Sequence, residues 1–304
     1  MTRKTLPVAM LALAVLCGCG GAAETGATEK AAALPSPGAA AAKDKKHQLE
    51  AAKADCMKQK GFKYVAWVQP EQPQSDEDRL RDAGDYQAMQ KYRQKYGFGV
   101  FALHVYPKEM NAPEAQMEGP NQDPNGKLQA ALSGAQLDAY NKAKDACMVT
   151  VAKQVLGVTL KSNIDYYNQI ALARRRATAS TLDTDPKLVE LATSMATCLK
   201  GKGYTVSDTT PTEMAKRGEN VFIKEQDKVG REQDDSVPDV APPGKKGQGR
   251  QIHMPSLTPE QAKPYLAKEI KAALDDLECG KDFYPVYTPR KSAIDTQIRA
   301  QFAY

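Results

Sequence analysis

The sequence is poor in the residues and motifs from which catalytic and metal sites are usually built. Its 304 residues include one tryptophan, three histidines and 7% aromatic residues. None of the histidines has a second histidine four residues later, which excludes the zinc-protease helix motif, and no Cys-x-x-Cys pair is present. The nucleophile elbow, the phosphate-binding loop and the dinucleotide-binding glycine pattern are also missing. The sequence therefore predicts no catalytic residue, no metal site and no cofactor.

A large excess of one charge and long apolar runs are equally scarce. Lysine and arginine number 42 against 37 aspartates and glutamates, and this net charge of +5 is too small to predict nucleic-acid binding. The mean hydropathy of −0.56 excludes a protein with several membrane spans. The apolar run of residues 6–16 would rise about 16 Å as a helix, against a hydrocarbon core of about 30 Å. With Arg3 and Lys4 before it, this run predicts a signal peptide and not a transmembrane anchor.

Residues 16–19, Leu-Cys-Gly-Cys, resemble a bacterial lipobox, in which a small residue precedes the cysteine that is lipidated. The resemblance implies cleavage after Gly18 and a diacylglyceryl group on the thiol of Cys19. We therefore expect a lipoprotein signal peptide over 1–18 and, over 19–45, the lipidated cysteine with a flexible tether. The lipid at Cys19 is then the predicted attachment to the outer face of the cytoplasmic membrane. Ordinary secretion, with cleavage a few residues later, is the alternative.

The rest of the chain contains an internal duplication. Residues 56–62 (Cys-Met-Lys-Gln-Lys-Gly-Phe) and 198–204 (Cys-Leu-Lys-Gly-Lys-Gly-Tyr) share a cysteine, two lysines and a glycine in the same register. A second related pair, 132–140 and 257–265, begins with Leu-Ser or Leu-Thr, carries glutamine at its fifth position and leads into a predicted helix with another cysteine. The pattern predicts two tandem copies of one unit. The units are expected at 46–180 and 181–304.

Four cysteines of the predicted units indicate two disulfides. An exported chain reaches an oxidising compartment, and an even number of cysteines suits a disulfide framework. Of the three possible pairings, the duplication favours Cys56 with Cys147 and Cys198 with Cys279, because each repeat should close on itself. Crossed pairing between the units and free buried thiols are the alternatives.

Local patterns predict a mainly α fold with a small β-hairpin. Aromatic and branched residues over 62–68 and 100–106 predict two strands that could pair as the hairpin. The expected architecture is two tandem helical units, each closed by a disulfide, behind a disordered N-terminal tether. Helices are expected over 44–60, 75–96, 161–179 and 186–201. Another helix is expected to begin at Thr210 and to be interrupted at Gly218. The last is expected from about Arg290, with an apolar stripe of Ile294, Ile298 and Phe302.

The aromatic residues of the expected hairpin supply the candidate binding surface. Alternation along residues 62–68 would bury only half of them, so Tyr64 or Trp67 could face solvent and contact a sugar or a protein. The same residues could instead be a small core of the first unit. A near match to a calcium loop begins at Asn121, but its twelfth position is Leu132 where the site needs glutamate, so it predicts an ordinary turn.

These motifs together resemble a family of actinobacterial secreted lipoproteins of unknown function. The family pattern is Cys-Met-x-x-x-Gly-Phe/Tyr, then Tyr-Gly-x-Gly, then Leu-Ser-x-x-Glu/Gln-x-x-Ala-Tyr before a second cysteine, and it falls here at 56–62, 96–99 and 132–140. The second copy lacks the Tyr-Gly-x-Gly segment, although residues 269–279 resemble the cysteine-bearing helix of the family. The resemblance implies an envelope location and paired disulfides, and it implies no activity.

The function expected from the sequence is non-catalytic. A membrane-anchored extracytoplasmic protein would bind an envelope protein or glycan, or serve as an accessory subunit, with the membrane as a further partner through Cys19. A solute-capture lipoprotein that feeds a transporter is the alternative. An envelope hydrolase is the third candidate, because a fold can bring together two carboxylates that lie apart in the sequence.

Overall fold

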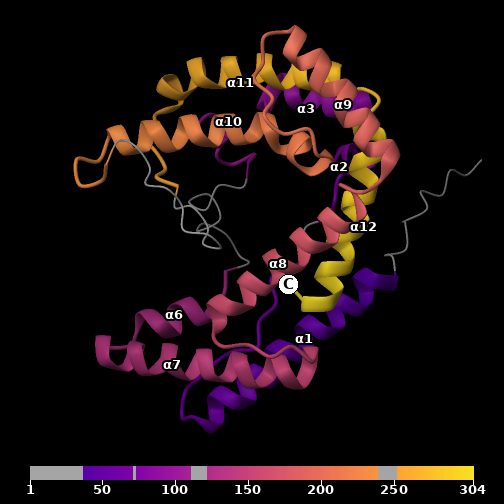
Figure 1. Cartoon of the computed structure of the whole chain (residues 1–304). Helices are drawn as coiled ribbons and strands as arrows, with labels where there is room; N and C mark the ends of the chain where they lie inside the picture. The colour runs from indigo at the N-terminus through magenta and orange to yellow at the C-terminus, as the bar shows by residue number, and fades with distance from the viewer. Residues whose placement is uncertain (1–36, 71–72, 111–121, 239–251) are drawn as a thin grey trace, which may run out of the picture. The chain divides into compact units, whose positions relative to one another are not determined.

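The computed structural model describes residues 37–70, 73–110, 122–238 and 252–304, within the unit Pro35–Tyr304 (Figure 1). The other unit, Met1–Leu34, lies outside the described residues, and so does Cys19. Every regular element in the described ranges is a helix, which confirms the mainly α class. The helices are α1 (Pro37–Gln59), α2 (Asp76–Asp82), α3 (Tyr86–Tyr96), α4 (Ala102–Val105), α6 (Pro124–Ala130), α7 (Gly134–Val151), η1 (Ala152–Leu156), α8 (Asn163–Thr181), α9 (Pro186–Gly201), α10 (Pro211–Glu232), α11 (Pro259–Cys279) and α12 (Tyr284–Phe302).

The predicted β-hairpin is wrong, because other groups satisfy the backbone that would have formed it. Residues 62–70 form no regular element, and Val65 exchanges both of its backbone hydrogen bonds with the side-chain amide of Asn125, at 2.8 and 2.9 Å. Its expected partner, 100–106, turns into the short helix α4. The N–H groups of Val100 and Phe101 donate to a side-chain carboxylate, so they are not free for a ladder.

The disulfide pairing favoured by the duplication is confirmed. Cys56 is bonded to Cys147 and joins α1 to α7, while Cys198 is bonded to Cys279 and joins α9 to α11. The Cα atoms are 5.7 and 5.5 Å apart in the two pairs. Loops of this length correspond to roughly 4–5 kcal/mol of stabilisation for each bond by the chain-entropy argument.

The helix starts shared by the two copies are also found. Ser133 and Gln136 form a capping box at the start of α7, and Thr258 and Gln261 form the same box at the start of α11. In each box the hydroxyl accepts a backbone N–H and the glutamine accepts one in return, which satisfies two helix-end donors. The glutamine of the repeated motif is thus explained as a structural residue.

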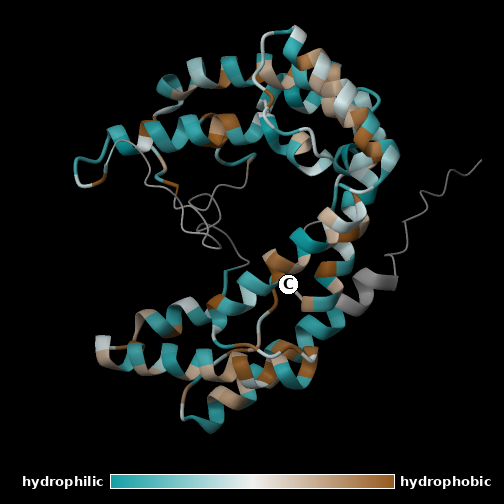
Figure 2. Ribbon diagram, in the orientation of Figure 1, coloured by the Kyte–Doolittle hydropathy of each residue, from teal (hydrophilic) through white to brown (hydrophobic). Residues whose placement is uncertain are grey.

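Contacts between helices cross the expected boundary of the two units. Helices α3 and α4, which precede residue 180, pack on α11, while α12 packs on α1 and α8. The largest core draws buried side chains from α1, α7, α8, α9, α11 and α12, and apolar residues gather where α7 meets α1 (Figure 2). The division into tandem units at 46–180 and 181–304 therefore remains a prediction.

Four of the predicted helices differ from expectation in where they begin, break or continue. α1 begins at Pro37 and not at Asp44, since alanines 39–42 favour helix. The expected helix over 75–96 breaks at Gly84, whose φ is +77°, into α2 and α3. α10 runs without interruption through Gly218, where the missing side chain leaves room for the ring of Phe98. The last helix begins earlier than Arg290, and its predicted apolar stripe is buried: Ile294, Ile298 and Phe302.

Gly218→Ala should destabilise the protein by about 1–3 kcal/mol, because an added Cβ would lie 2.1 Å from Cζ of Phe98 in a packed site. Gly201→Ala is the matched control, since nothing lies within 4 Å of a Cβ there. Urea unfolding of both variants measures the two effects. A Gly218→Ala variant as stable as the control would contradict this packing.

Candidate functional site

The Tyr-Gly-x-Gly segment forms a loop that binds a carboxylate of the protein itself. The N–H groups of Phe98, Val100 and Phe101 donate to the two carboxylate oxygens of Glu269 on α11, at 2.8, 2.9 and 2.8 Å. Gly97 has φ +61°, and a Cβ there would lie 2.7 Å from Cγ of Glu269. Successive N–H groups around such glycines form an anion-binding concavity, and here the anion is internal.

Glu269 is completely buried beneath this loop. Burial raises the pKa of Glu269 above its ordinary value of 4.5, and the backbone hydrogen bonds that favour the ionised form only partly offset this effect. The carboxyl group is therefore enclosed by the backbone and has no opening to solvent.

A second carboxylate lies two turns further along the same face of α11. Asp276 accepts hydrogen bonds from Arg93 of α3 at 2.8 Å, from Arg217 of α10 at 3.2 Å and from the hydroxyl of Tyr284 of α12. Arg93 also donates to the carbonyl oxygen of Ala273 at 2.8 Å. Because each partner comes from a different helix, Asp276 links α3, α10 and α12 to α11.

Aromatic rings complete the surroundings of Arg93. Its guanidinium lies 4.6 Å from the ring centroid of Tyr284 and 5.3 Å from that of Phe98. Burial alone would lower the pKa of Arg93, but the nearby Tyr284 and Asp276 raise it above its usual range, so this guanidinium keeps its charge.

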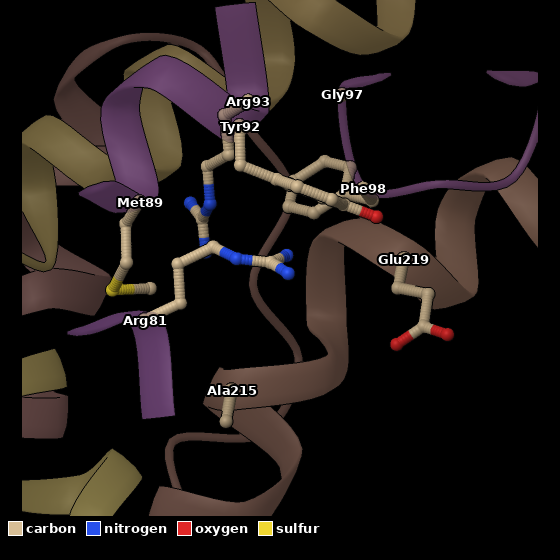
Figure 3. Close-up of a pocket in the computed structure, with 8 residues that line it drawn as sticks. All are labelled: Arg81, Met89, Tyr92, Arg93, Gly97, Phe98, Ala215 and Glu219. Carbon is tan, nitrogen blue, oxygen red and sulfur yellow. The ribbon is translucent and has the colours of Figure 1, made fainter. Parts of the chain in front are cut away.

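A small pocket of about 210 Å³ lies beside these two carboxylates, between α2–α3 and α10 (Figure 3). Figure 3 shows the guanidinium groups of Arg81 and Arg93 directed to the middle of this space, while the carboxylate of Glu219 points away from them. The guanidinium of Arg81 lies 4.0 Å from the ring centroid of Tyr92. The lining residues are Arg81, Met89, Tyr92, Arg93, Gly97, Phe98, Ala215 and Glu219.

The predicted binding residues Tyr64 and Trp67 do not line this pocket. Tyr64 is half-buried and donates to Glu50 at 2.7 Å, while the amine of Lys53 lies 5.1 Å from its ring centroid. Burial raises the pKa of the Tyr64 hydroxyl well above its usual range. Trp67 is also half-buried. Their role as a binding surface stays a prediction.

The described part of the near match to a calcium loop has structural roles. Asp123 caps α6 by accepting the N–H of Asn125 at 2.8 Å, and Asn125 is buried against the backbone of Val65. Asn121 lies outside the described residues. Among the residues that the structure describes, no group of three or more His, Cys, Asp or Glu side chains is placed to hold a metal ion. In the same ranges, no helix has the length and apolar character needed to cross a membrane.

Sequence reasoning missed the site residues, although one signal was available. The buried face of α11 includes Ala262, Leu266 and Ala273, and Glu269 and Asp276 occupy the same face. A carboxylate at a position where the helical period requires an apolar residue indicates a buried polar contact. Apart from Tyr284, the partners of these carboxylates lie about 60 to 180 residues away and leave no such local signal.

Comparison with known proteins gives no assignment. No protein-family model, no curated protein and no solved structure matches the chain. The interpretation of the site therefore rests on its geometry and chemistry.

Glu269→Gln should change how stability depends on pH. Because its pKa is raised in the folded state, the wild-type side chain stabilises the fold most below the ordinary value of 4.5. This contribution is lost as the pH rises through the raised pKa. The unfolding free energy of the wild type minus that of the variant should therefore fall as the pH rises above 4.5, as measured by urea unfolding.

Glu260→Gln, at an exposed position of the same helix, is the control and should reproduce the wild-type pH dependence. If the unfolding free energy of the wild type minus that of Glu269→Gln is constant or grows with pH, the raised pKa of Glu269 is contradicted.

Proposed function

We propose that the protein is a lipid-anchored lipoprotein on the outer face of the cytoplasmic membrane, where it binds an envelope protein and catalyses no reaction. The short positive segment, the apolar run and the cysteine at position 19 support the location. Two disulfides that tie helices far apart in the sequence suit an oxidising compartment. The anchor and the location rest on the sequence, because Cys19 lies outside the described residues.

The use of the buried ionisable groups supports a non-catalytic role. Glu269 is bonded to backbone N–H groups, and Asp276 is bonded to Arg93 and Arg217. Asp227 is bonded to Arg231 within α10. A general acid or base must lie within hydrogen-bond reach of its substrate. Since these groups are enclosed and bonded to the fold itself, we infer that they stabilise the structure.

The observation that carries the proposed binding role is an exposed apolar face on α8. Ile164 and Tyr167 are 72% and 60% exposed, the highest values among the large apolar side chains described, and Leu172 is 42% exposed. Arg175 and Arg176, further along the same helix, are also exposed. Exposed apolar side chains on a helix that also carries two exposed cations fit a protein partner with apolar and acidic groups.

A second candidate, solute capture, is favoured by the pocket between α2–α3 and α10. Its lining combines charged side chains with aromatic rings, as ligand sites commonly do. This candidate is compatible with lipid anchoring, because the pocket and the anchor are separate features of the chain.

The location is tested by a non-reduced peptide mass map of the protein extracted from native membranes. The expected N-terminal peptide begins at Cys19 and carries a diacylglyceryl group. An unmodified peptide that begins a few residues later would contradict the anchor and favour ordinary secretion.

The partner surface is tested by a photo-crosslinking residue, Tyr167→p-benzoylphenylalanine, introduced into the lipidated protein in its membrane. The same residue at Val189, which is 40% exposed on α9, is the matched control. We expect adducts from position 167 alone, linked to a partner peptide with acidic residues beside apolar ones. Arg175→Glu combined with Arg176→Glu should reduce their yield at least fivefold. Equal yields from positions 167 and 189, or adducts with lipid only, would contradict a protein partner on this face.

A further inference from the structure

The pocket beside Arg81 is separate from the proposed partner surface on α8. Guanidinium groups and aromatic rings lie together in its walls, which come from α2, α3 and α10. We propose that this pocket binds a small aromatic carboxylate, with the carboxylate on Arg81 and the aromatic ring against Tyr92 and Phe98. The proposal rests on the solute-capture candidate and does not depend on lipid anchoring or on the partner surface.

The walls of the pocket are fixed before any ligand binds. Phe98 is held by the hydrogen bond from its N–H to Glu269 and by the close fit of its ring over Gly218. Arg93 is held by Asp276 at 2.8 Å. A site whose side chains are already ordered loses little conformational freedom when a ligand binds.

Arg81 is the group best placed to contact a carboxylate. Its described ion pair is with Asp78, three residues earlier in α2, and this contact uses only the Nη2 atom. The side chain of Arg81 is 28% exposed, and its guanidinium lies over the ring of Tyr92. A guanidinium has five N–H donors in a planar fork that matches a carboxylate, so donors remain for a ligand.

The remaining lining residues select for an aromatic group of limited size. The rings of Tyr92 and Phe98 and the thioether of Met89 offer apolar contacts. The volume of about 210 Å³ is below the range of about 300–1,000 Å³ that is typical of sites for drug-sized ligands. A single aromatic ring with a carboxylate is therefore the class of ligand that suits both the size and the charge of the pocket.

Glu219 is the one lining residue whose charge opposes an anion. Its side chain is exposed, and Figure 3 shows its carboxylate pointing away from the two guanidinium groups. Removing this negative charge should therefore strengthen the binding of an aromatic carboxylate and leave the binding of an uncharged analogue unchanged.

The test measures binding of benzoate to the purified full protein by isothermal titration calorimetry at low salt, with benzamide as the uncharged analogue. Saturable binding of benzoate is expected, at least tenfold tighter than that of benzamide. Arg81→Gln should weaken benzoate binding at least tenfold, and Glu219→Gln should strengthen it about twofold to threefold. Arg79→Gln is the matched control, because Arg79 forms the equivalent ion pair with Asp76 on the same helix but does not line the pocket.

The results that overturn the proposal are distinct. Absence of saturable benzoate binding to the wild type would end it. Equal weakening by Arg81→Gln and Arg79→Gln would show a general charge effect and not a site. Circular dichroism and thermal unfolding check that each variant folds. If Arg81→Gln does not fold, Glu219→Gln still decides, because weaker benzoate binding in that variant contradicts the predicted charge of the pocket.

Discussion

The positions of the described helices near the pocket depend on two buried carboxylates that lie on one face of α11. Glu269 accepts the backbone N–H groups of the loop after α3, and Asp276 accepts hydrogen bonds from α3, α10 and α12. Removing one partner from a buried ion pair typically costs about 3–5 kcal/mol, because the other charge stays buried without compensation. The segments that meet here lie far apart in the sequence, so α11 acts as the common support that fixes their positions.

The pocket is a consequence of this support. The glycine-rich loop is bent around Glu269, which places the ring of Phe98 over Gly218 of α10. The same bend leaves Arg93 between Asp276 and the aromatic rings, and Arg81 approaches from α2. A glycine motif that could have served to bind an external anion is thus used inside the protein, and the partly exposed Arg81 nearby is the cation that we propose for solute binding. The proposed partner surface on α8 is a separate feature of the molecule.

Features encoded locally or by repetition could be predicted from the sequence. The disulfide pairs followed from the duplication, the buried stripe of α12 followed from its helical period, and the mainly α class followed from the helix signals. The hairpin prediction was wrong because strand propensity reflects only the local sequence. The N–H and carbonyl groups of Val65 were satisfied by Asn125, sixty residues away, and the N–H of Val100 by Glu269, much further away. The pocket could not be predicted for the same reason, since its walls meet only after α11 has gathered them.

Native-state hydrogen exchange of the backbone amides of Phe98, Val100 and Phe101 tests the central role of α11 most directly. These amides donate to a fully buried carboxylate, so exchange should require an opening with a free energy close to that of global unfolding. Glu269→Ala should speed their exchange by orders of magnitude. Exchange in the wild type at the rate of an exposed loop would contradict the account, because the loop would then not be held by α11.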